Sequence, residues 1–312
     1  QGVGAKQVNA KGEIYEDKYG ITTSQRVYGT TQENLEGRGP CYLRTEGIEK
    51  EKDTDLKKAY LNMAPSQTLK WIEQGKDPSE QNVEIEGTEP YIVGGHTASG
   101  YWVNTNRETT IHGLYAAGDV AGGCPQKYVT GALVEGEIAA LDIVEKLKEQ
   151  TFDTTDHKEE QLLDEKVKEY NNILSDKDSI FTIEQMEEAM QKVMDEYAGG
   201  IAVNYQFNGK QLNLAKEKIA RLSELADKVG AEDMHELLFA YELTERLLVC
   251  QVLIEHLKNR KETRWHSFNE NLDHPETDQK FEKYVNSRME DGKIRILFRD
   301  LVKGDTYEHT NS

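Results

Sequence analysis

The sequence has little cysteine: Cys41, Cys124 and Cys250 are the three in 312 residues. They lie roughly 80 to 130 residues apart, a spacing that provides neither a CxxC metal-binding motif nor a disulfide framework. Low cysteine use suits a reducing compartment. An iron–sulfur cluster normally needs a close group of thiolates, so any cluster that serves this protein would be held by another chain.

Basic residues are also few relative to acidic ones: the sequence has 38 Lys and Arg against 57 Asp and Glu, which gives a formal charge of −19. A chain this acidic will not bind nucleic acid by neutralising phosphates, which excludes that class of partner. No stretch approaches the roughly 20 apolar residues of a membrane span, and residues 1–13 lack the apolar core of a secretory signal. We therefore expect a cytoplasmic protein.

Two phosphate-binding motifs are missing. Neither GxGxxG followed by an acidic residue nor GxxxxGK[ST] occurs in the sequence. The chain also has no initiator Met and no opening strand, glycine turn and helix. We expect it to be a piece of a longer protein.

Composition divides the chain into four parts. Residues 1–90 combine strand-like runs, glycine-rich loops and one clear helix over 66–74, capped by Ser66, and predict part of a mixed α+β layer. Residues 91–150 hold the apolar runs PYIVGG, GYWVN and GLYAAG, then a helix over 128–149, which predicts an α/β unit. Residues 151–260 have apolar residues at helical spacing, most strongly over 232–259, and predict a helical bundle. Residues 261–312 contain one strand-like run at 293–298.

Small residues line the helix predicted over 128–149. They are Gly131, Ala132, Gly136, Ala139 and Ala140. A helix face without large side chains permits the close approach of a sheet, another backbone or a flat cofactor.

A glycine turn after the apolar run at 91–93 carries Gly94, Gly95 and His96. The imidazole would stand at the end of a buried strand, where ligand sites of α/β proteins form. A histidine that merely caps the turn is the more common situation.

The run GLYAAGD at 113–119 places Asp119 after Gly118, at the end of a small apolar strand and ahead of the long helix. A carboxylate there can accept hydrogen bonds from ribose or ribityl hydroxyls. The amides at the start of the following helix attract an anion or an electron-rich ring edge. An Asp that only caps the turn is an equal alternative.

Other reactive residues have simpler interpretations. Lys127 could attract an anion, but a lone Lys is usually solvated surface. Cys124 has no base within a recognisable motif, so we expect it to pack. Arg260, Arg264, Trp265 and His266 cluster after the second long helix, where basic side chains would complement the helix dipole. Arg264 and Trp265 are expected to pack there.

Two blocks, EPYIVGGHTASGYWVNTNRETTIHGLYAAGDVAGG and QKYVTGALVEGEIAALDIV, are similar to the C-terminal flavin-binding half of the fumarate reductase and succinate dehydrogenase flavoprotein superfamily. Within it, the chain most resembles the adenylylsulfate reductase alpha-subunit family. The similarity extends upstream to GRGPCYLRTE and MAPSQTLKWIEQGKDP and downstream to ETRWHSFNENLDHPE. It implies a partial capping domain over 1–90, the C-terminal part of an FAD-binding domain over 91–150, a helical domain over 151–260 and a C-terminal segment over 261–312. The family's N-terminal FAD fingerprint would lie upstream.

The resemblance also implies roles for individual residues. His96 matches the active-site histidine near flavin and substrate, and Asp119 matches the acidic residue that holds the ribityl chain. The helix start would lie beside the pyrimidine edge of the flavin ring. The expected FAD contacts are Gly94, Gly95, Gly118, Asp119, Tyr128, Val129, Thr130, Gly131, Ala132 and Leu133. No metal site is expected, and the substrate-site arginine would lie in the absent portion or at its edge.

One departure separates the members of the superfamily. Dicarboxylate-handling members have Arg–Leu–Gly–Ala/Gly–Asn–Ser at this helix start, where the present chain has Lys-Tyr-Val-Thr-Gly-Ala over 127–132. The loss of a bidentate arginine argues against fumarate or succinate as substrate.

The resemblance thus implies an FAD oxidoreductase subunit that reduces adenosine 5′-phosphosulfate (adenylyl sulfate) to sulfite and AMP. Its electrons would come from an iron–sulfur beta subunit, and this piece alone would be inactive. A fumarate reductase or succinate dehydrogenase-like flavoprotein is one alternative, and a non-catalytic scaffold built on a flavoprotein half is another.

Overall fold

The computed structural model describes residues 4–63, 65–87, 100–122, 128–149, 158–175, 179–264 and 269–301. Contacts divide the chain into two compact units. One comprises Gln1–Val93 with Trp265–Asn269, and the other comprises Gly94–Arg264 with Glu270–Ser312. The four-part division expected from the sequence remains a prediction.

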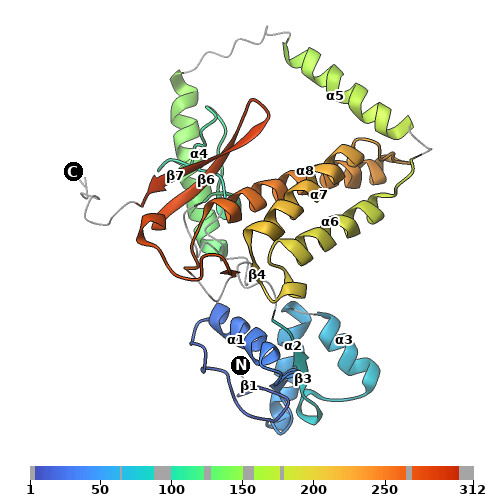
Figure 1. Cartoon of the computed structure of the whole chain (residues 1–312), viewed down its shortest axis with the longest axis vertical. Helices are drawn as coiled ribbons and strands as arrows, with labels where there is room; N and C mark the ends of the chain where they lie inside the picture. The colour runs from blue at the N-terminus through green and yellow to red at the C-terminus, as the bar shows by residue number, and fades with distance from the viewer. Residues whose placement is uncertain are drawn as a thin grey trace. The chain divides into compact units, whose positions relative to one another are not determined.

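The N-terminal unit contains a three-stranded antiparallel sheet in the order β1-β2-β3 and three α-helices (Figure 1). Its elements are β1 (Lys6–Val8), α1 (Thr23–Leu35), β2 (Cys41–Arg44), α2 (Asp53–Met63), α3 (Pro65–Gln74) and β3 (Val83–Ile85). Leu43 of β2 lies between Gln7 and Val83 in the register. The buried core of the unit consists of Ala5, Leu43, Leu56, Trp71 and Val83.

The sequence predicts one helix in this unit, and the structure corrects that prediction with α1 and α2. Helix α1 is too polar to show an apolar stripe, and its start is set locally instead. Thr22 and Gln25 form a capping box, in which Thr22 Oγ1 accepts the Gln25 N–H at 3.3 Å and Gln25 Oε1 accepts the Thr22 N–H at 3.2 Å. Helix α3 begins at Pro65, so Ser66 is helical and not the cap; proline suits the first helical turn, where its missing N–H costs nothing.

The second unit begins with residues 100–122 and α4 (Tyr128–Glu149), which has the predicted bounds. The strand expected over 114–117 is not formed: Tyr115 makes a single bridge to Glu108. A strand needs a continuous ladder with a neighbour, and the described residues offer Tyr115 only this one pairing. The 3-10 helix η4 (Gly118–Val120) follows it.

Four further helices form the body of the second unit, as the apolar periodicity predicts. They are α5 (Lys158–Ser175), α6 (Ile183–Tyr197), α7 (Gly209–Ala226) and α8 (Met234–Asn259). Helices α6, α7 and α8 share one core, in which Leu212, Ile219, Leu243, Leu247 and Ile254 are among the most deeply buried side chains. Short parallel strands β4 (Gln206–Phe207) and β5 (Glu270–Asn271) connect this body to the C-terminal region.

The C-terminal region is a hairpin of β6 (Lys283–Glu290) and β7 (Lys293–Asp300). The sequence predicts one strand here, and β6 corrects that prediction. Asp291 and Gly292 join the strands with φ values of 48° and 70°, the left-handed geometry of a tight hairpin turn. Polar and apolar residues are mixed in β6, so its sequence does not indicate a strand, whereas the Asp-Gly pair at 291–292 indicates the hairpin turn.

Candidate functional site

The residues predicted to carry chemistry fall into two groups. Gly94, Gly95 and His96 lie outside the described residues, as do Lys127 and Cys124. Gly118 and Asp119 lie in η4, and residues 128–133 form the start of α4. The candidate site is therefore built from the η4 turn and the first two turns of α4.

Gly118 brings these two elements together. Its φ of +76° is a conformation that side chains with a Cβ rarely adopt, and a Cβ at this position would lie 3.4 Å from the Ala132 Cβ. Its N–H donates a 2.8 Å hydrogen bond to Oε2 of Glu135, one turn further along α4. The positive φ accounts for the glycine, and the hydrogen bond to Glu135 places Asp119 beside the start of the helix.

Asp119 has an exposed side chain on this turn. Among the described residues its carboxylate has no hydrogen-bond or ion-pair partner. The backbone around it is closed by the Ala121 N–H, which donates to the Gly118 carbonyl at 3.0 Å. A carboxylate held on an ordered turn without a partner is a ready acceptor for ligand hydroxyls.

The start of α4 supplies two further features. Its first backbone amides have no partner within the helix and carry the positive end of the helix dipole. Val129 and Leu133 are 76% and 70% exposed, respectively, so apolar surface lies next to polar donors. This combination suits a flat ligand with an apolar face and an electron-rich edge.

Glu135 was not singled out by the sequence, yet it is 6% exposed and central to the site. Besides the Gly118 N–H, it meets Arg107, whose Nε lies 3.2 Å from Glu135 Oε1. The signal in the sequence is a stripe at helical spacing, formed by Ala132, Glu135, Ala139, Asp142 and Lys146. This stripe is the face of α4 that receives the 100–122 segment.

A polar cluster anchors the other end of that stripe. Lys146 Nζ lies 2.8 Å from Glu108 Oε2, 2.9 Å from Asp142 Oδ2 and 2.9 Å from the Tyr115 hydroxyl. Tyr115 also donates to Asp142. The hydrogen bond from Lys146 lowers the pKa of Glu108, and the hydrogen bonds from Tyr115 and Lys146 lower the pKa of Asp142. These contacts fix the segment that carries Asp119 onto the helix.

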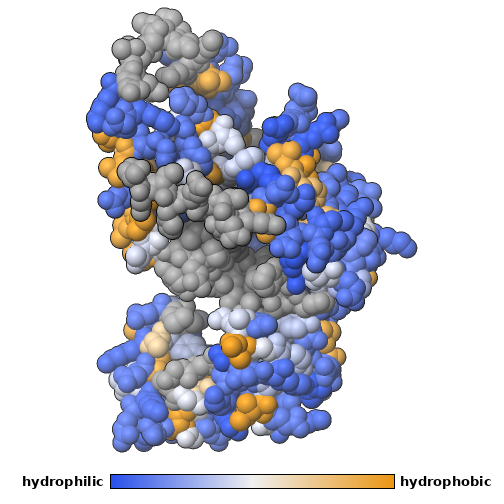
Figure 2. All heavy atoms as spheres, turned by 90° about the vertical axis from the view of Figure 1, so that its left-hand side faces the viewer, coloured by the Kyte–Doolittle hydropathy of each residue, from blue (hydrophilic) through white to orange (hydrophobic). Residues whose placement is uncertain are grey.

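Opposite this stripe, α4 presents an apolar surface. Its exposed side chains include Val129, Leu133, Leu141, Val144 and Leu147, which are 46% to 76% exposed. Apolar side chains also reach the surface in the view of Figure 2. Of the five predicted small residues, Ala132 and Ala139 lie on the stripe that faces 100–122, while this other surface stays exposed.

Gly100 lies at the start of the 100–122 segment, where its backbone approaches the backbone of residues 120–122 closely. A Cβ on Gly100 would lie 2.7 Å from both the Gly122 nitrogen and the Val120 oxygen. The close approach lets the Tyr101 N–H donate to the Val120 carbonyl at 2.7 Å and the Gly122 N–H donate to the Tyr101 carbonyl at 2.9 Å. The Asp119 turn is therefore paired on its far side to residue 101.

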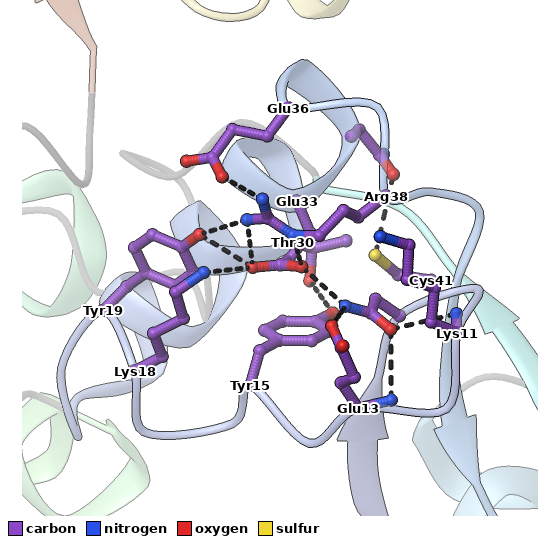
Figure 3. Close-up of polar contacts among 12 residues, drawn as sticks. Lys11, Glu13, Tyr15, Lys18, Tyr19, Thr30, Glu33, Glu36, Arg38 and Cys41 are labelled. Carbon is purple, nitrogen blue, oxygen red and sulfur yellow. Dashed lines mark hydrogen bonds and ion pairs between the residues drawn. The ribbon is translucent and has the colours of Figure 1, made fainter.

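The N-terminal unit contains a separate charged cluster, which the sequence also did not indicate (Figure 3). Glu33 is 1% exposed, and its carboxylate accepts from Arg38 Nε at 2.6 Å and Nη2 at 2.7 Å. Lys18 Nζ, the Tyr19 hydroxyl and Asn9 Nδ2 donate to the same carboxylate at 2.9, 2.7 and 2.9 Å. Arg38, with the other donors, holds the pKa of Glu33 well below its usual range. Because the partners satisfy one another, the cluster orders α1 against the GRGPCYL segment.

Arg264 packs as expected, and Arg260 lies in the same cluster. Both bind the buried Glu262: Arg260 donates at 2.5 Å and Arg264 donates twice at 2.9 Å. Trp265 lies outside the described residues. No group of three or more potential ligands for a metal ion occurs within the described ranges. Across the same ranges, no helix combines the length and the apolar character of a membrane span.

No family model matches the sequence. Among curated proteins, the chain is 25% identical to subunit alpha of the adenylylsulfate reductase of Megalodesulfovibrio gigas, over 93% of this chain and 53% of the relative. It is 26% identical to an uncharacterized FAD-dependent oxidoreductase of Methanocaldococcus jannaschii, over 83% of this chain and 44% of the relative. The chain spans about half the length of the curated relatives it matches.

Among solved structures, adenylylsulfate reductases are again similar to this chain. Adenylylsulfate reductase of Archaeoglobus fulgidus is 30% identical, with a TM-score of 0.83 over 96% of this chain and 56% of that one. An adenosine-5-phosphosulfate reductase in complex with sulfite, as a covalent adduct, is 31% identical with a TM-score of 0.83 and the same coverage. Quinol fumarate reductase of E. coli is 19% identical with a TM-score of 0.76 over 96% of this chain and 55% of that one, a likeness of fold alone.

Proposed function

Because the chain is homologous to the alpha subunit of adenylylsulfate reductase, as its motifs predict, we propose that it forms the FAD-binding part of an oxidoreductase. The observation that supports this most directly is the exposed carboxylate of Asp119 on the Gly118 turn beside the start of α4, which has no partner within the described part of the chain. The mixed helix and strand fold is the one these relatives have.

The residues at the turn fit FAD. Asp119 would accept hydrogen bonds from ribityl hydroxyls, and the first amides of α4 would face the pyrimidine edge of the ring. Val129 and Leu133 supply apolar surface for the ring itself. Bound FAD would supply two-electron chemistry, and the chain would supply orientation and charge.

The proposed substrate is adenosine 5′-phosphosulfate. The support is the difference in identity, 30% to 31% for the sulfur enzymes against 19% for the fumarate reductase, together with the Lys-Tyr-Val-Thr-Gly-Ala sequence at 127–132. Two electrons break the bond between sulfur and the phosphate oxygen and release sulfite and AMP. His96 is the proposed group that stabilises the sulfate oxygens or moves a proton.

The electrons would come from an iron–sulfur partner subunit. Three widely separated cysteines in the sequence do not make a cluster site. The name of the relative, subunit alpha, also places that protein in an assembly with another subunit.

The test is a reoxidation experiment on the flavin-loaded full-length protein. The flavin is first reduced photochemically without oxygen, and adenosine 5′-phosphosulfate or fumarate is then added. The proposal predicts reoxidation by adenosine 5′-phosphosulfate with one sulfite and one AMP per flavin. Reoxidation by fumarate alone would favour the dicarboxylate alternative, and a flavin that reacts with neither would favour the scaffold alternative.

A further inference from the structure

The C-terminal hairpin reaches the segment that carries the candidate flavin turn. The guanidinium carbon of Arg299, on β7, lies 3.7 Å from the centroid of the Trp102 ring and 5.1 Å from that of Tyr284. Arg299 Nε also donates to Asn286 Oδ1 at 2.7 Å. The arginine is therefore held from its own hairpin, by Tyr284 and Asn286 of β6, and presents its planar face to Trp102.

Trp102 lies near the start of the 100–122 segment, between two residues that pair with other parts of it. Its neighbour Tyr101 pairs with Val120 and Gly122 through hydrogen bonds of 2.7 and 2.9 Å, and Val103 bridges to Thr109. Asp119 lies one residue before the first of these pairings. A contact that fixes Trp102 therefore fixes the backbone of residue 101, with which the residues after Asp119 are paired.

Hydrogen bonds from Arg260 hold the start of the hairpin. A two-stranded hairpin is marginally stable by itself, and here Arg260 at the end of α8 donates to the carbonyls of Phe281 and Lys283 at 3.2 and 2.8 Å. The buried Glu262 holds Arg260 in turn. The connection thus runs from α8 through the hairpin to Trp102.

We propose that Arg299 is a positioning residue for the flavin-binding turn: its stacking on Trp102 orders the pairing of residue 101 with 120–122 and so sets the place of Asp119. The proposal rests on the proposed function, because it assigns the turn to FAD. Arg299 is proposed to act through Trp102 and not by contact with FAD or substrate.

The test measures hydrogen exchange of the Tyr101 and Gly122 amides in the ligand-free full-length protein, and then its FAD affinity. In Arg299→Met, which keeps the aliphatic stem and loses the cation, exchange of both amides should become about 5- to 30-fold faster. FAD affinity should weaken by a similar factor. Arg299→Lys, which retains a cation but not the planar fork, should restore part of both effects.

Two further variants keep the result interpretable. Arg295→Met, on the same strand but paired with Glu290 at 3.4 Å, should leave both readouts at wild-type values. Trp102→Leu should reproduce the exchange effect, and its combination with Arg299→Met should add little, because both remove one contact.

Each outcome decides the proposal. Unchanged exchange in Arg299→Met shows that the stacking of Arg299 on Trp102 does not order the pairing of residue 101 with 120–122, and overturns the proposal. Faster exchange with unchanged FAD affinity overturns the positioning role and leaves a purely structural contact. If the full-length wild-type protein binds no FAD while Arg299→Met still exchanges faster, the flavin assignment of the turn fails, and the positioning role fails with it, although the contact between hairpin and segment stands.

Discussion

Replacing Glu135 tests whether the Gly118–Asp119 turn is held by α4. The carboxylate is 6% exposed, accepts the Gly118 N–H at 2.8 Å and lies 3.2 Å from Arg107 Nε. Glu135→Ala would leave the Gly118 N–H without this acceptor and Arg107 without this counter-charge. A hydrogen bond to a charged group contributes about 1.5 to 3 kcal/mol, and removing one partner of a buried ion pair costs about 3 to 5 kcal/mol.

Arg107 retains 24% exposure of its side chain, so water recovers part of that second cost. We expect a total loss of about 3 kcal/mol of local stability for Glu135→Ala. Glu135→Gln keeps an acceptor for Gly118 and loses only the charge, so it should cost about half as much, roughly 1.5 kcal/mol.

Amide hydrogen exchange at Gly118 measures this directly. A loss of about 3 kcal/mol corresponds to exchange on the order of 100-fold faster. The control is Glu137→Gln, which changes an exposed carboxyl two residues further along the same helix and should alter nothing. Wild-type protection of Gly118 in Glu135→Ala would refute the view that this carboxylate holds the turn.

Two further predictions concern the packing of each unit. Glu33→Gln in the N-terminal unit should lower stability by about 3 kcal/mol at neutral pH, because it breaks the buried pair with Arg38. Since the folded-state pKa of Glu33 lies well below its usual value, its contribution is present above the unfolded pKa of about 4.3 and is lost as pH falls toward the folded pKa. Urea midpoints of wild type and variant should therefore converge from pH 7 to pH 3, and a constant gap would contradict this. Gly100→Ala should separate residue 101 from 120–122, since its Cβ would lie 2.7 Å from the Gly122 nitrogen; wild-type protease resistance of the 100–122 segment would count against it.

The sequence predicts the elements whose signals are local and strong. Helix α4 follows from an uninterrupted run of helix-compatible residues, and α8 from repeated apolar residues. Helix α1 is missed because its capping box, Thr22 with Gln25, determines its start while its composition is polar. Strand β6 is missed because polar and apolar residues are mixed in it, and its antiparallel pairing with β7, rather than alternation, stabilises it.

The candidate site divides in the same way. Gly118 and Asp119 are predictable because the backbone requires a glycine and a carboxylate follows it. Glu135 is not, since a Glu inside a charged helix is usually solvated, and its role depends on a turn 17 residues away. The role of His96 stays a prediction because it lies outside the described residues.

An FAD titration of the full-length protein and of its Asp119→Ala variant, followed by the visible flavin absorbance, tests whether the Asp119 turn binds FAD, with Glu137→Gln as the matched control. Losing charge-assisted hydrogen bonds to the ribityl hydroxyls should weaken binding by about 10- to 100-fold in Asp119→Ala. The control should titrate as wild type does. Saturable binding by wild type that weakens this way is the predicted result; no binding by wild type, or the same affinity in Asp119→Ala, would contradict the assignment of the turn to FAD.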